Sequence, residues 1–349
     1  MWLETPVFQE DMQYVCDSEC IDWEKLRGST VLISGGTGLI GYTMISALLY
    51  ANQCRKLDLR IIALVRNLER AKAQFAAQLS HSDALSFVVG TVEQIPQLES
   101  QVDYIIHGAC PTSSTFMVEH PVATIKASVL GTLNLLDLAK EKQVKGFVYL
   151  SSMEAYGKIE SEERLTEDHL GYINPTVVRS CYPESKRMCE GICASYAKEF
   201  GIRAQSVRLA QTFGPGVAYE DKRVFALMAR CAMNGEDIVL QTKGASRHPY
   251  LYTAQAVSAI LCVLLCGEAG QVYNAANPET YCSVWEMGEQ VAAELGEGKI
   301  EIRVAENGDH SKYPSPSNLN LDIGAISSLG WKPQGTLMDM YRRMMCVMK

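Results

Sequence analysis

Apolar and polar positions follow two different rhythms along roughly the first 210 residues of the chain. Short apolar runs are typical of buried strands, and longer stretches with helical spacing separate them. The runs that predict strands are residues 30–34, 59–65, 85–89, 104–107, 146–150 and 204–209. The stretches that predict helices are 42–50, 69–79, 122–140 and one that ends near residue 200. This alternation predicts an α/β fold built on a doubly wound parallel sheet.

The pattern loosens after residue 213. A helix is expected over 224–234, a short strand over 250–252 and an apolar helix over 254–266. Loops and short elements follow residue 274. Residues 1–27 are rich in acidic and aromatic side chains, and we expect an accessory segment packed on the outside of the domain.

A glycine-rich stretch directly follows the first predicted strand. It reads Gly35-Gly36-Thr37-Gly38-Leu39-Ile40-Gly41 and leads into the helix at 42–50. Glycines let backbone N–H groups approach a pyrophosphate, and a helix N-terminus favours its negative charge. The spacing is G-x-x-G-x-x-G rather than the G-x-G-x-x-G fingerprint, so a merely structural turn is the alternative. The context predicts a dinucleotide site formed by Gly35, Thr37, Gly38, Leu39, Ile40 and Gly41.

The end of the second predicted strand bears on the choice of dinucleotide. An acidic residue at that position accepts hydrogen bonds from the adenosine ribose. This sequence has Arg66-Asn67 instead. Arg66 could pair with the 2′-phosphate of NADP, stack on the adenine, or be a solvated loop residue. We expect NAD as the cofactor, with NADP as the alternative that Arg66 leaves open.

Composition narrows the classes of function. A length of 349 residues suits one large α/β unit or two joined lobes, and a net charge of −8 argues against nucleic acid or an anionic membrane as the main partner. The twelve cysteines include no Cys-x-x-Cys pair, so no metal site is expected, and free thiols fit a reducing cytoplasm. No signal peptide is recognisable, and the apolar stretch 257–266 is too short to span a bilayer. We expect a soluble cytoplasmic protein.

Candidate chemistry gathers around two later segments. Ser151-Ser152-Met153-Glu154 follows the strand at 146–150, and such strand ends bind ligands in parallel sheets. Tyr182 and Lys186 are four residues apart and share one face of a helix. A fixed ammonium lowers the pKa of a nearby phenol from about 10, and the phenolate can then accept a proton from a substrate hydroxyl. Taken alone, the pair is weak evidence, because Tyr-x-x-x-Lys occurs by chance in many helices and is usually a surface tyrosine beside a solvated lysine.

With the glycine loop, the strand-end serines and the Tyr/Lys helix in this order, the chain resembles the extended short-chain dehydrogenases/reductases. It is most similar to their nucleotide-sugar epimerase/dehydratase/decarboxylase branch, from about Leu26 to the C-terminus. Within that branch the segment 171–187 resembles UDP-glucuronate decarboxylases. It contains Asn174-Pro175, Arg179-Ser180-Cys181-Tyr182 and Lys186-Arg187. Glu154 matches a glutamate that decarboxylases and 4,6-dehydratases carry just before a Tyr-Gly pair.

Three departures from the branch leave the reaction outcome open. Met153 stands where dehydratases have an aspartate and decarboxylases a serine, which counts against dehydration. Gln211 replaces an asparagine that contacts the substrate diphosphate. Ser128 replaces an asparagine near the active site.

The resemblance implies a role for each candidate catalytic residue. Tyr182, with its pKa lowered by Lys186 and by the nicotinamide charge, takes the proton of the sugar 4-hydroxyl while hydride passes to the nicotinamide. Ser152 hydrogen-bonds the same oxygen, and Lys186 also holds the nicotinamide ribose. Glu154 handles the proton at C5, unless it is a structural carboxylate. The 4-ketone then permits loss of a C5 carboxylate, or rotation and reduction on the other face, and the dinucleotide is regenerated.

The resemblance also implies contacts and assembly. Ala109 and Ser151 are expected to contact the cofactor. Ser113, in the loop 111–121, and Gln211 are expected to contact the substrate. Arg223 and Arg247 match positions that hold the nucleotide diphosphate, which bidentate guanidinium groups suit. A homodimer is expected through the helices at 122–140 and at Tyr182, where apolar residues on the first helix include Leu133, Leu135, Leu136 and Leu138.

These expectations divide the chain into an accessory segment, an NAD(P)-binding Rossmann-like domain and a smaller lobe. Residues 1–27 form the segment, 28–213 with about 248–276 the domain, and 214–247 with 277–349 the lobe that binds the nucleotide sugar.

Alternative functions remain open at this point. A nucleotide-sugar 4-epimerase or a 4,6-dehydratase shares the first oxidation step with a decarboxylase. A catalytically retired Rossmann protein that senses dinucleotide would not need Ser152, Tyr182 and Lys186. A reductase of small carbonyl compounds is favoured only by Arg66, and it would have no use for a diphosphate site at Arg223 and Arg247.

Overall fold

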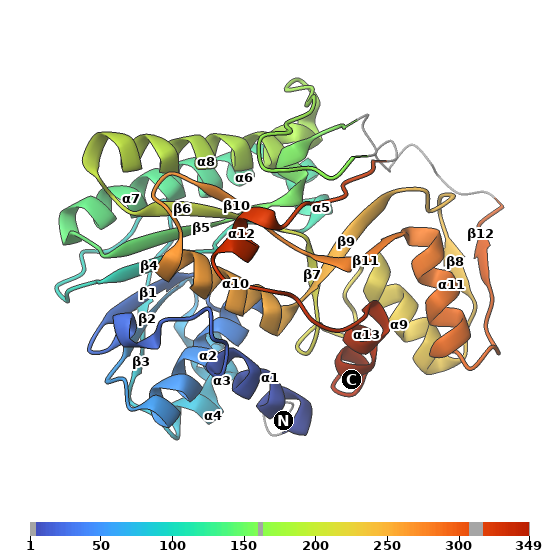
Figure 1. The fold of residues 1–349 in the computed structure, drawn as a ribbon, viewed down its shortest axis with the longest axis horizontal. Helices are drawn as coiled ribbons and strands as arrows, with labels where there is room; N and C mark the ends of the chain where they lie inside the picture. The colour runs from blue at the N-terminus through green and yellow to red at the C-terminus, as the bar shows by residue number, and fades with distance from the viewer. Residues whose placement is uncertain (1–4, 160–162, 307–316, 349) are drawn as a thin grey trace.

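Seven parallel strands form the central sheet of this protein, whose computed structural model describes residues 5–159, 163–306 and 317–348. The strands are β1 (Thr30–Ser34), β2 (Arg60–Val65), β3 (Leu85–Val89), β4 (Tyr104–His107), β5 (Gly146–Ser152), β6 (Ala204–Leu209) and β10 (Val272–Ala275). Their order is β10-β6-β5-β4-β1-β2-β3, with parallel pairing throughout (Figure 1). The strand order reverses between β1 and β4, where doubly wound sheets bind ligands. The predicted fold class is confirmed.

Helices cover both faces of this sheet (Figure 1). On one face lie α2 (Leu39–Arg55), α3 (Leu68–Gln74), α4 (Ala76–Leu79) and α10 (Thr253–Cys266). On the other lie α7 (Gly131–Lys142) and α8 (Cys181–Phe200). Successive strand residues point to opposite faces. Ile33 therefore joins the core that contains Val257, whereas Leu32 joins the core that contains Leu135.

One long helix interrupts its own hydrogen-bond pattern. It consists of α6 (Pro121–Ile125), a π-helical turn (Lys126–Leu130) and α7, and follows α5 (Ser114–Glu119). By length and composition alone, Pro121–Lys142 is apolar enough to cross a membrane, a test that core helices of soluble proteins also pass. Its Leu135 and Leu136 are fully buried against the sheet. The expectation that these two leucines belong to a dimer surface is therefore wrong; the exposed apolar side chains are Val122, Ile125 and Leu130.

A smaller group of elements lies to the right of the large sheet in Figure 1. It contains a three-stranded sheet of β7 (Gln211–Phe213), β9 (Arg247–Tyr252) and β11 (Asn277–Ser283), and the parallel pair β8 (Ile238–Leu240) and β12 (Ile302–Val304). Its helices are α9 (Val224–Asn234), α11 (Val284–Glu294) and α13 (Leu337–Met345). The short helix α12 (Gly324–Ser328) packs against β10 of the large sheet. The domain boundaries drawn from the sequence stay a prediction. Residues 248–252, which were assigned to the larger domain, belong to β9 of the three-stranded sheet.

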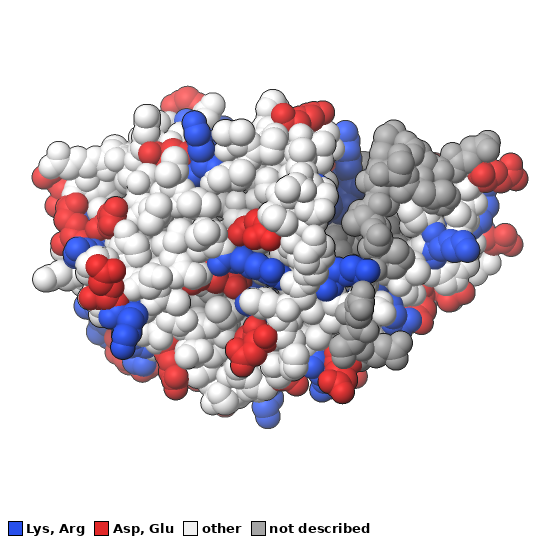
Figure 2. All heavy atoms as spheres, turned by 90° about the horizontal axis from the view of Figure 1, so that it is seen from above, with Lys and Arg blue, Asp and Glu red and all other residues white. Residues whose placement is uncertain are grey.

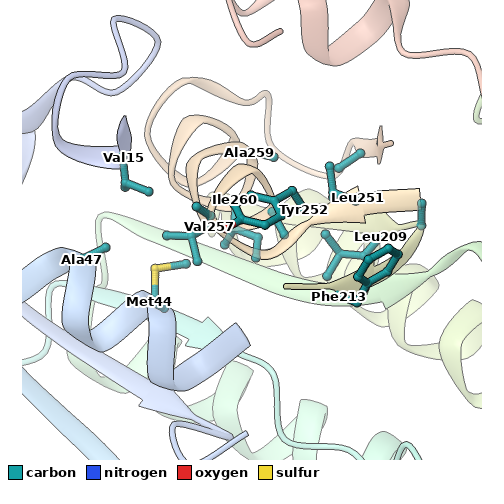
Figure 3. Close-up of a cluster of buried hydrophobic side chains, with 14 of the residues drawn as sticks. Val15, Met44, Ala47, Leu209, Phe213, Leu251, Tyr252, Val257, Ala259 and Ile260 are labelled. Carbon is teal, nitrogen blue, oxygen red and sulfur yellow. The ribbon is translucent and has the colours of Figure 1, made fainter. Parts of the chain in front are cut away.

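The N-terminal segment is joined closely to the domain. Helix α1 (Pro6–Cys16) packs on α2 and α10, and a 3₁₀ turn at Trp23–Leu26 follows it. Figure 3 shows Val15 of α1 and Met44 of α2 beside Val257 of α10. The segment therefore contributes to the main core rather than lying only on the surface.

Charge and cysteine chemistry give no competing site. Acidic and basic side chains are interspersed on the face seen in Figure 2. All twelve cysteines are free thiols. Among the residues that the structure describes, no three His, Cys, Asp or Glu side chains gather in a way that could hold a metal ion.

Candidate active site

The glycine loop between β1 and α2 is shaped by close backbone contacts. Gly35 has a φ of +77°, and a Cβ there would lie 2.7 Å from the carbonyl carbon of Gly108. A Cβ on Gly41 would fall on the carbonyl oxygen of Gly35. At Gly38 the only neighbour is that same oxygen, at 3.4 Å, so the outer side of the loop is open. The loop can therefore approach a ligand backbone-first, as the sequence predicts.

The start of α2 can accept an anion. Gly38 is its N-cap, no side chain caps the helix, and no acidic residue lies in the first turn. The first N–H groups of a helix have no partner within it, and they carry the positive end of its dipole. The residues present thus fit the pyrophosphate of a dinucleotide, with Thr37, Leu39 and Ile40 beside it in the turn. Arg66 is exposed where β2 ends, and Asn67 caps α3 by accepting a hydrogen bond from the Arg70 N–H.

The end of β4 lies next to this loop at the switch point of the sheet. β4 ends at His107, which is fully buried between the hydroxyls of Ser34 (2.8 Å) and Thr132 (3.2 Å). Burial, with a contribution from the charge of Lys186, lowers the pKa of His107 to about 3, so the ring is neutral. The Ala109 N–H donates to the Ser34 hydroxyl, which fixes the main chain after β4.

Strand β5 ends in the residue that contacts the candidate base. Ser152 caps a 3₁₀ turn (Met153–Tyr156), and its hydroxyl accepts from the Glu154 N–H at 3.2 Å. The same hydroxyl lies close enough to the Tyr182 phenol to lower its pKa. Tyr182 lies in the first turn of α8 and is 7% exposed. The structure thus brings Ser152 and Tyr182 together as predicted.

Lys186 lies one turn further along α8 and is buried with Tyr182. Its ammonium donates to the carbonyl oxygen of Leu150 at 2.6 Å and lies 5.4 Å from the centre of the Tyr182 ring. The Tyr182 pKa, however, is raised, first by burial and then by Cys110 and Glu154, against the lowering effect of Ser152. The expected lowering by Lys186 is therefore wrong for the protein alone, because burial outweighs it.

Glu154 has a partner that the sequence analysis left without a role. Arg179 donates to both carboxylate oxygens of Glu154, at 2.9 and 3.1 Å, and reaches the Ser114 hydroxyl at 3.5 Å. Its guanidinium also lies 5.6 Å from the centre of the Tyr182 ring. Arg179 lies in the 3₁₀ turn Val178–Ser180 just before α8. It is 25 residues from Glu154 in sequence, so no spacing marked this contact. Glu154 is consequently an ion-paired carboxylate beside the candidate base.

The predicted substrate residues come from other elements than this cluster, although Ser113 directly precedes Ser114, which Arg179 reaches. The Ser113 hydroxyl caps α5 by accepting from the Phe116 N–H. Gln211 begins β7 and is level with Tyr250 of β9, so Arg247 is three residues, roughly 10 Å, before it along that strand.

The two arginines expected to hold the diphosphate each have an acidic partner. Arg223 pairs with Asp221 at 2.6 Å, and Arg247 pairs with Glu286 at 2.8 Å. No contact joins the two arginines within the described chain, so their joint role stays a prediction.

Comparison with known proteins shows the family of this chain. The model of the NAD dependent epimerase/dehydratase family matches residues 31–276. UDP-glucuronic acid decarboxylase 3 of Arabidopsis thaliana is 31% identical over 312 residues, covering 88% of this chain and 86% of that protein. The chain belongs to the NAD-dependent epimerase/dehydratase family.

Further relatives of this epimerase/dehydratase agree on the fold. UDP-glucuronic acid decarboxylase 1 of Xenopus tropicalis is 26% identical, covering 87% of this chain and 68% of that protein. A dTDP-glucose 4,6-dehydratase of Streptomyces venezuelae, solved with NAD bound, has a TM-score of 0.74 at 23% identity, covering 91% of this chain and 96% of the other. A UDP-glucose 4-epimerase of Thermotoga maritima, solved with UDP-glucose, has a TM-score of 0.72 at 19% identity, covering 91% and 98%.

Ser128, which replaces an asparagine of related enzymes, lies close to the candidate site. Ser128 lies in the π-helical turn, where its hydroxyl donates to the Thr124 carbonyl at 2.9 Å and is 3.2 Å from the Cys110 sulfur. Cys110 in turn is close enough to Tyr182 to raise its pKa. Such π-bulges are frequent at functional sites. Cys110 had no signal in the sequence that could have marked it.

Proposed function

We propose that this chain oxidises C4 of a nucleotide-linked sugar and then decarboxylates it, acting on a substrate such as UDP-glucuronate. The observation that carries the proposal is the contact of Ser152 with Tyr182 at the end of β5, with Lys186 one turn away. The family and the decarboxylases that resemble the chain over 88% of its length support the class of substrate.

The residues divide the oxidation among them. Tyr182 takes the proton of the C4 hydroxyl, and Ser152 holds the same oxygen through its hydroxyl. A bound nicotinamide dinucleotide supplies an acceptor for hydride and, when oxidised, a positive charge. Since burial raises the Tyr182 pKa in the protein alone, that added cation is needed to favour the phenolate. Lys186 keeps the end of β5 in place through the Leu150 carbonyl.

Glu154 and Arg179 suit the second step. A ketone at C4 stabilises negative charge at C5, so a carboxylate on C5 can leave as carbon dioxide. Glu154 is two residues after Ser152 and lies close to Tyr182, where it can handle the C5 proton. Arg179 orients Glu154 through two charge-assisted hydrogen bonds. Met153 counts against the 4,6-dehydratase alternative.

The cofactor is proposed to be NAD, with NADP as the second candidate. The open glycine loop and the uncapped start of α2 suit the pyrophosphate of either. Arg66 is exposed at the end of β2, where it can meet a 2′-phosphate. Titration of both cofactors by fluorescence, with Arg66→Ala as the comparison, separates them. An NADP preference that Arg66→Ala abolishes would assign NADP, and an unchanged NAD preference would assign NAD.

The deciding experiment is incubation of purified protein with NAD and a panel of nucleotide sugars, followed by product masses. Loss of carbon dioxide from UDP-glucuronate supports the proposal. Loss of water would indicate a dehydratase, and a new stereoisomer of unchanged mass an epimerase. Bound dinucleotide with no conversion of any sugar would favour the dinucleotide sensor.

The protein is further proposed to act as a cytoplasmic homodimer. Exposed apolar side chains gather on α5, α6 and α8, namely Val118 (52%), Val122 (63%), Ile125 (43%) and Met188 (57%). α6 packs against α8, so a second copy could cover both. Sedimentation of Val122→Glu should give a monomer if this surface joins two copies.

A further inference from the structure

A buried ion pair joins β6 to α8, the helix that carries the candidate base Tyr182. Arg208 on β6 donates to both carboxylate oxygens of Glu190 on α8, at 3.0 and 2.8 Å. The two side chains are only 3% and 7% exposed. Arg208 also donates to the Glu167 carbonyl at 2.7 Å and lies 4.7 Å from the centre of the Tyr156 ring. None of these atoms has a role in the proposed reaction.

Ser151 connects this pair to the active site. Its hydroxyl donates to a Glu190 oxygen at 2.5 Å, and Ser151 is level with Arg208 across the β5–β6 pairing. The single O–H donor of Ser151 is therefore used by Glu190. The cofactor contact expected at Ser151 stays a prediction. The residue that follows Ser151 is Ser152, the partner of Tyr182.

Helix α8 is consequently attached to the end of β5 at two successive residues. Lys186 bonds the Leu150 carbonyl, and Glu190, four residues later on the same face of α8, bonds Ser151. These two bonds set how far Tyr182 and Lys186 stand from Ser152. Misplacement of reacting groups by about 1 Å can cost about a hundredfold in rate. A buried ion pair, by contrast, adds little net stability over apolar side chains of similar volume.

We propose that Glu190 and Arg208 are positioning residues for the C4 oxidation, acting through Ser151 on Ser152. The inference rests on the proposed function. Arg208 holds the Glu190 carboxylate in one orientation, Glu190 accepts the Ser151 hydroxyl, and the end of β5 is thereby fixed against α8. The pair touches neither the substrate nor the cofactor.

A pair of double variants tests the proposal. Glu190→Leu/Arg208→Met replaces both charges by apolar groups, so no charge is left buried alone. We expect a folded protein whose kcat on UDP-glucuronate is lower by about ten- to hundredfold, with KM within about threefold. Glu190→Gln/Arg208→Met restores an acceptor for Ser151 without the charge, and it should recover most of the lost kcat. The matched control, Glu294→Leu/Arg342→Met, removes an exposed pair between α11 and α13 and should keep the kcat of the wild type.

Two results would overturn the inference. They are a folded Glu190→Leu/Arg208→Met variant with wild-type kcat, and a folded glutamine variant no better than the leucine variant. Ser151→Ala, which removes only one hydroxyl, keeps the question open to measurement if the double variants do not fold. It should lower kcat about tenfold at most with KM unchanged, and a full kcat would count against the proposal.

A readout without turnover separates this inference from the proposed function. Amide hydrogen exchange of residues 146–154 should be faster in Glu190→Leu/Arg208→Met than in the wild type, and unchanged in the control. If the wild type converts no sugar in the panel, the proposed function fails. Faster exchange confined to this segment would then still support the positioning role, and unchanged exchange would overturn it.

Discussion

The two lobes of the molecule hold their candidate site residues in opposite ways. In the parallel-sheet lobe, Tyr182 and Lys186 are buried. Lys186 donates to the Leu150 carbonyl on β5, and Tyr182 lies beside Ser152 at the end of that strand. In the smaller lobe, the side chains of Arg223 and Arg247 are 42% and 36% exposed, and each forms an ion pair with a neighbouring carboxylate.

This difference in burial suits the first pair of residues to a chemical step and the second pair to substrate binding. A group whose charge changes during a reaction works best in surroundings that need not rearrange. An exposed ion pair is worth about 0–1 kcal/mol, so a diphosphate can displace its carboxylate at small cost. Substitutions in the first lobe should therefore change kcat, and substitutions in the second should change KM.

Replacing Tyr182 by phenylalanine should have the largest effect. The ring still fills its site on α8, but no proton acceptor remains for the C4 hydroxyl, so kcat should fall by about a thousandfold or more. Binding of NAD, followed by fluorescence, should change little. Tyr172→Phe, on an exposed tyrosine, serves as the control. A fully active Tyr182→Phe protein would refute the mechanism.

Glu154→Gln should affect the second step more than the first. Oxidation at C4 keeps Tyr182 and Ser152, whereas C5 loses the group that protonates it after carbon dioxide has left. The return of hydride to C4 should therefore slow by about a hundredfold. Single-turnover absorbance at 340 nm should then show NADH that forms and persists. An equal slowing of NADH formation would mean that Glu154 has only the structural role left open by the sequence.

Arg223→Leu and Arg247→Leu should raise KM for the nucleotide sugar with little change in kcat. A hydrogen bond from a charged group is worth about 1.5–3 kcal/mol, so each KM should rise by about ten- to hundredfold. Arg342→Leu, which removes an exposed arginine from α13 of the same lobe, is the control. A fall in kcat with KM unchanged at either position would break the division between the lobes.

Most of the sheet could be predicted from the sequence because burial on both faces leaves a strong mark. The runs 30–34, 85–89 and 204–209 coincide with β1, β3 and β6, and the expected helix 224–234 coincides with α9. The π-helical turn within 121–142 could not be predicted, because its residues show the same apolar pattern as the helix on either side. The integration of residues 1–27 into the core was likewise invisible without the partner helices.

The site could be predicted only in part, for a related reason. Helical spacing and the strand end were enough to bring Tyr182, Lys186 and Ser152 together. In the protein alone the Tyr182 pKa is raised rather than lowered, and the sequence could not show this because it does not report burial. The partners of Glu154 and Ser151 come from elsewhere in the fold, so tertiary contacts rather than spacing assigned them.

The smallest predicted effect concerns the junction between the lobes, where Asp11 of α1 meets Tyr252 of β9 and Arg343 of α13. Asp11 accepts from the Tyr252 phenol at 2.8 Å and from Arg343 at 2.8 Å. Burial raises the Asp11 pKa from 3.8 to about 6, although both hydrogen bonds oppose it. The folded protein therefore holds this proton more tightly than the unfolded chain, and the stability it confers is lost as pH rises through 6.

Asp11→Asn removes this titration while an acceptor and the packing remain. Between pH 5 and pH 7, the free energy of unfolding of the wild type should fall by about 1 kcal/mol more than that of the variant. Urea unfolding at the two pH values measures the difference. Asp17→Asn, at the exposed end of the same helix, should keep the wild-type pH dependence. An Asp11→Asn protein whose stability depends on pH as strongly as that of the wild type would show that Asp11 does not cause this pH dependence.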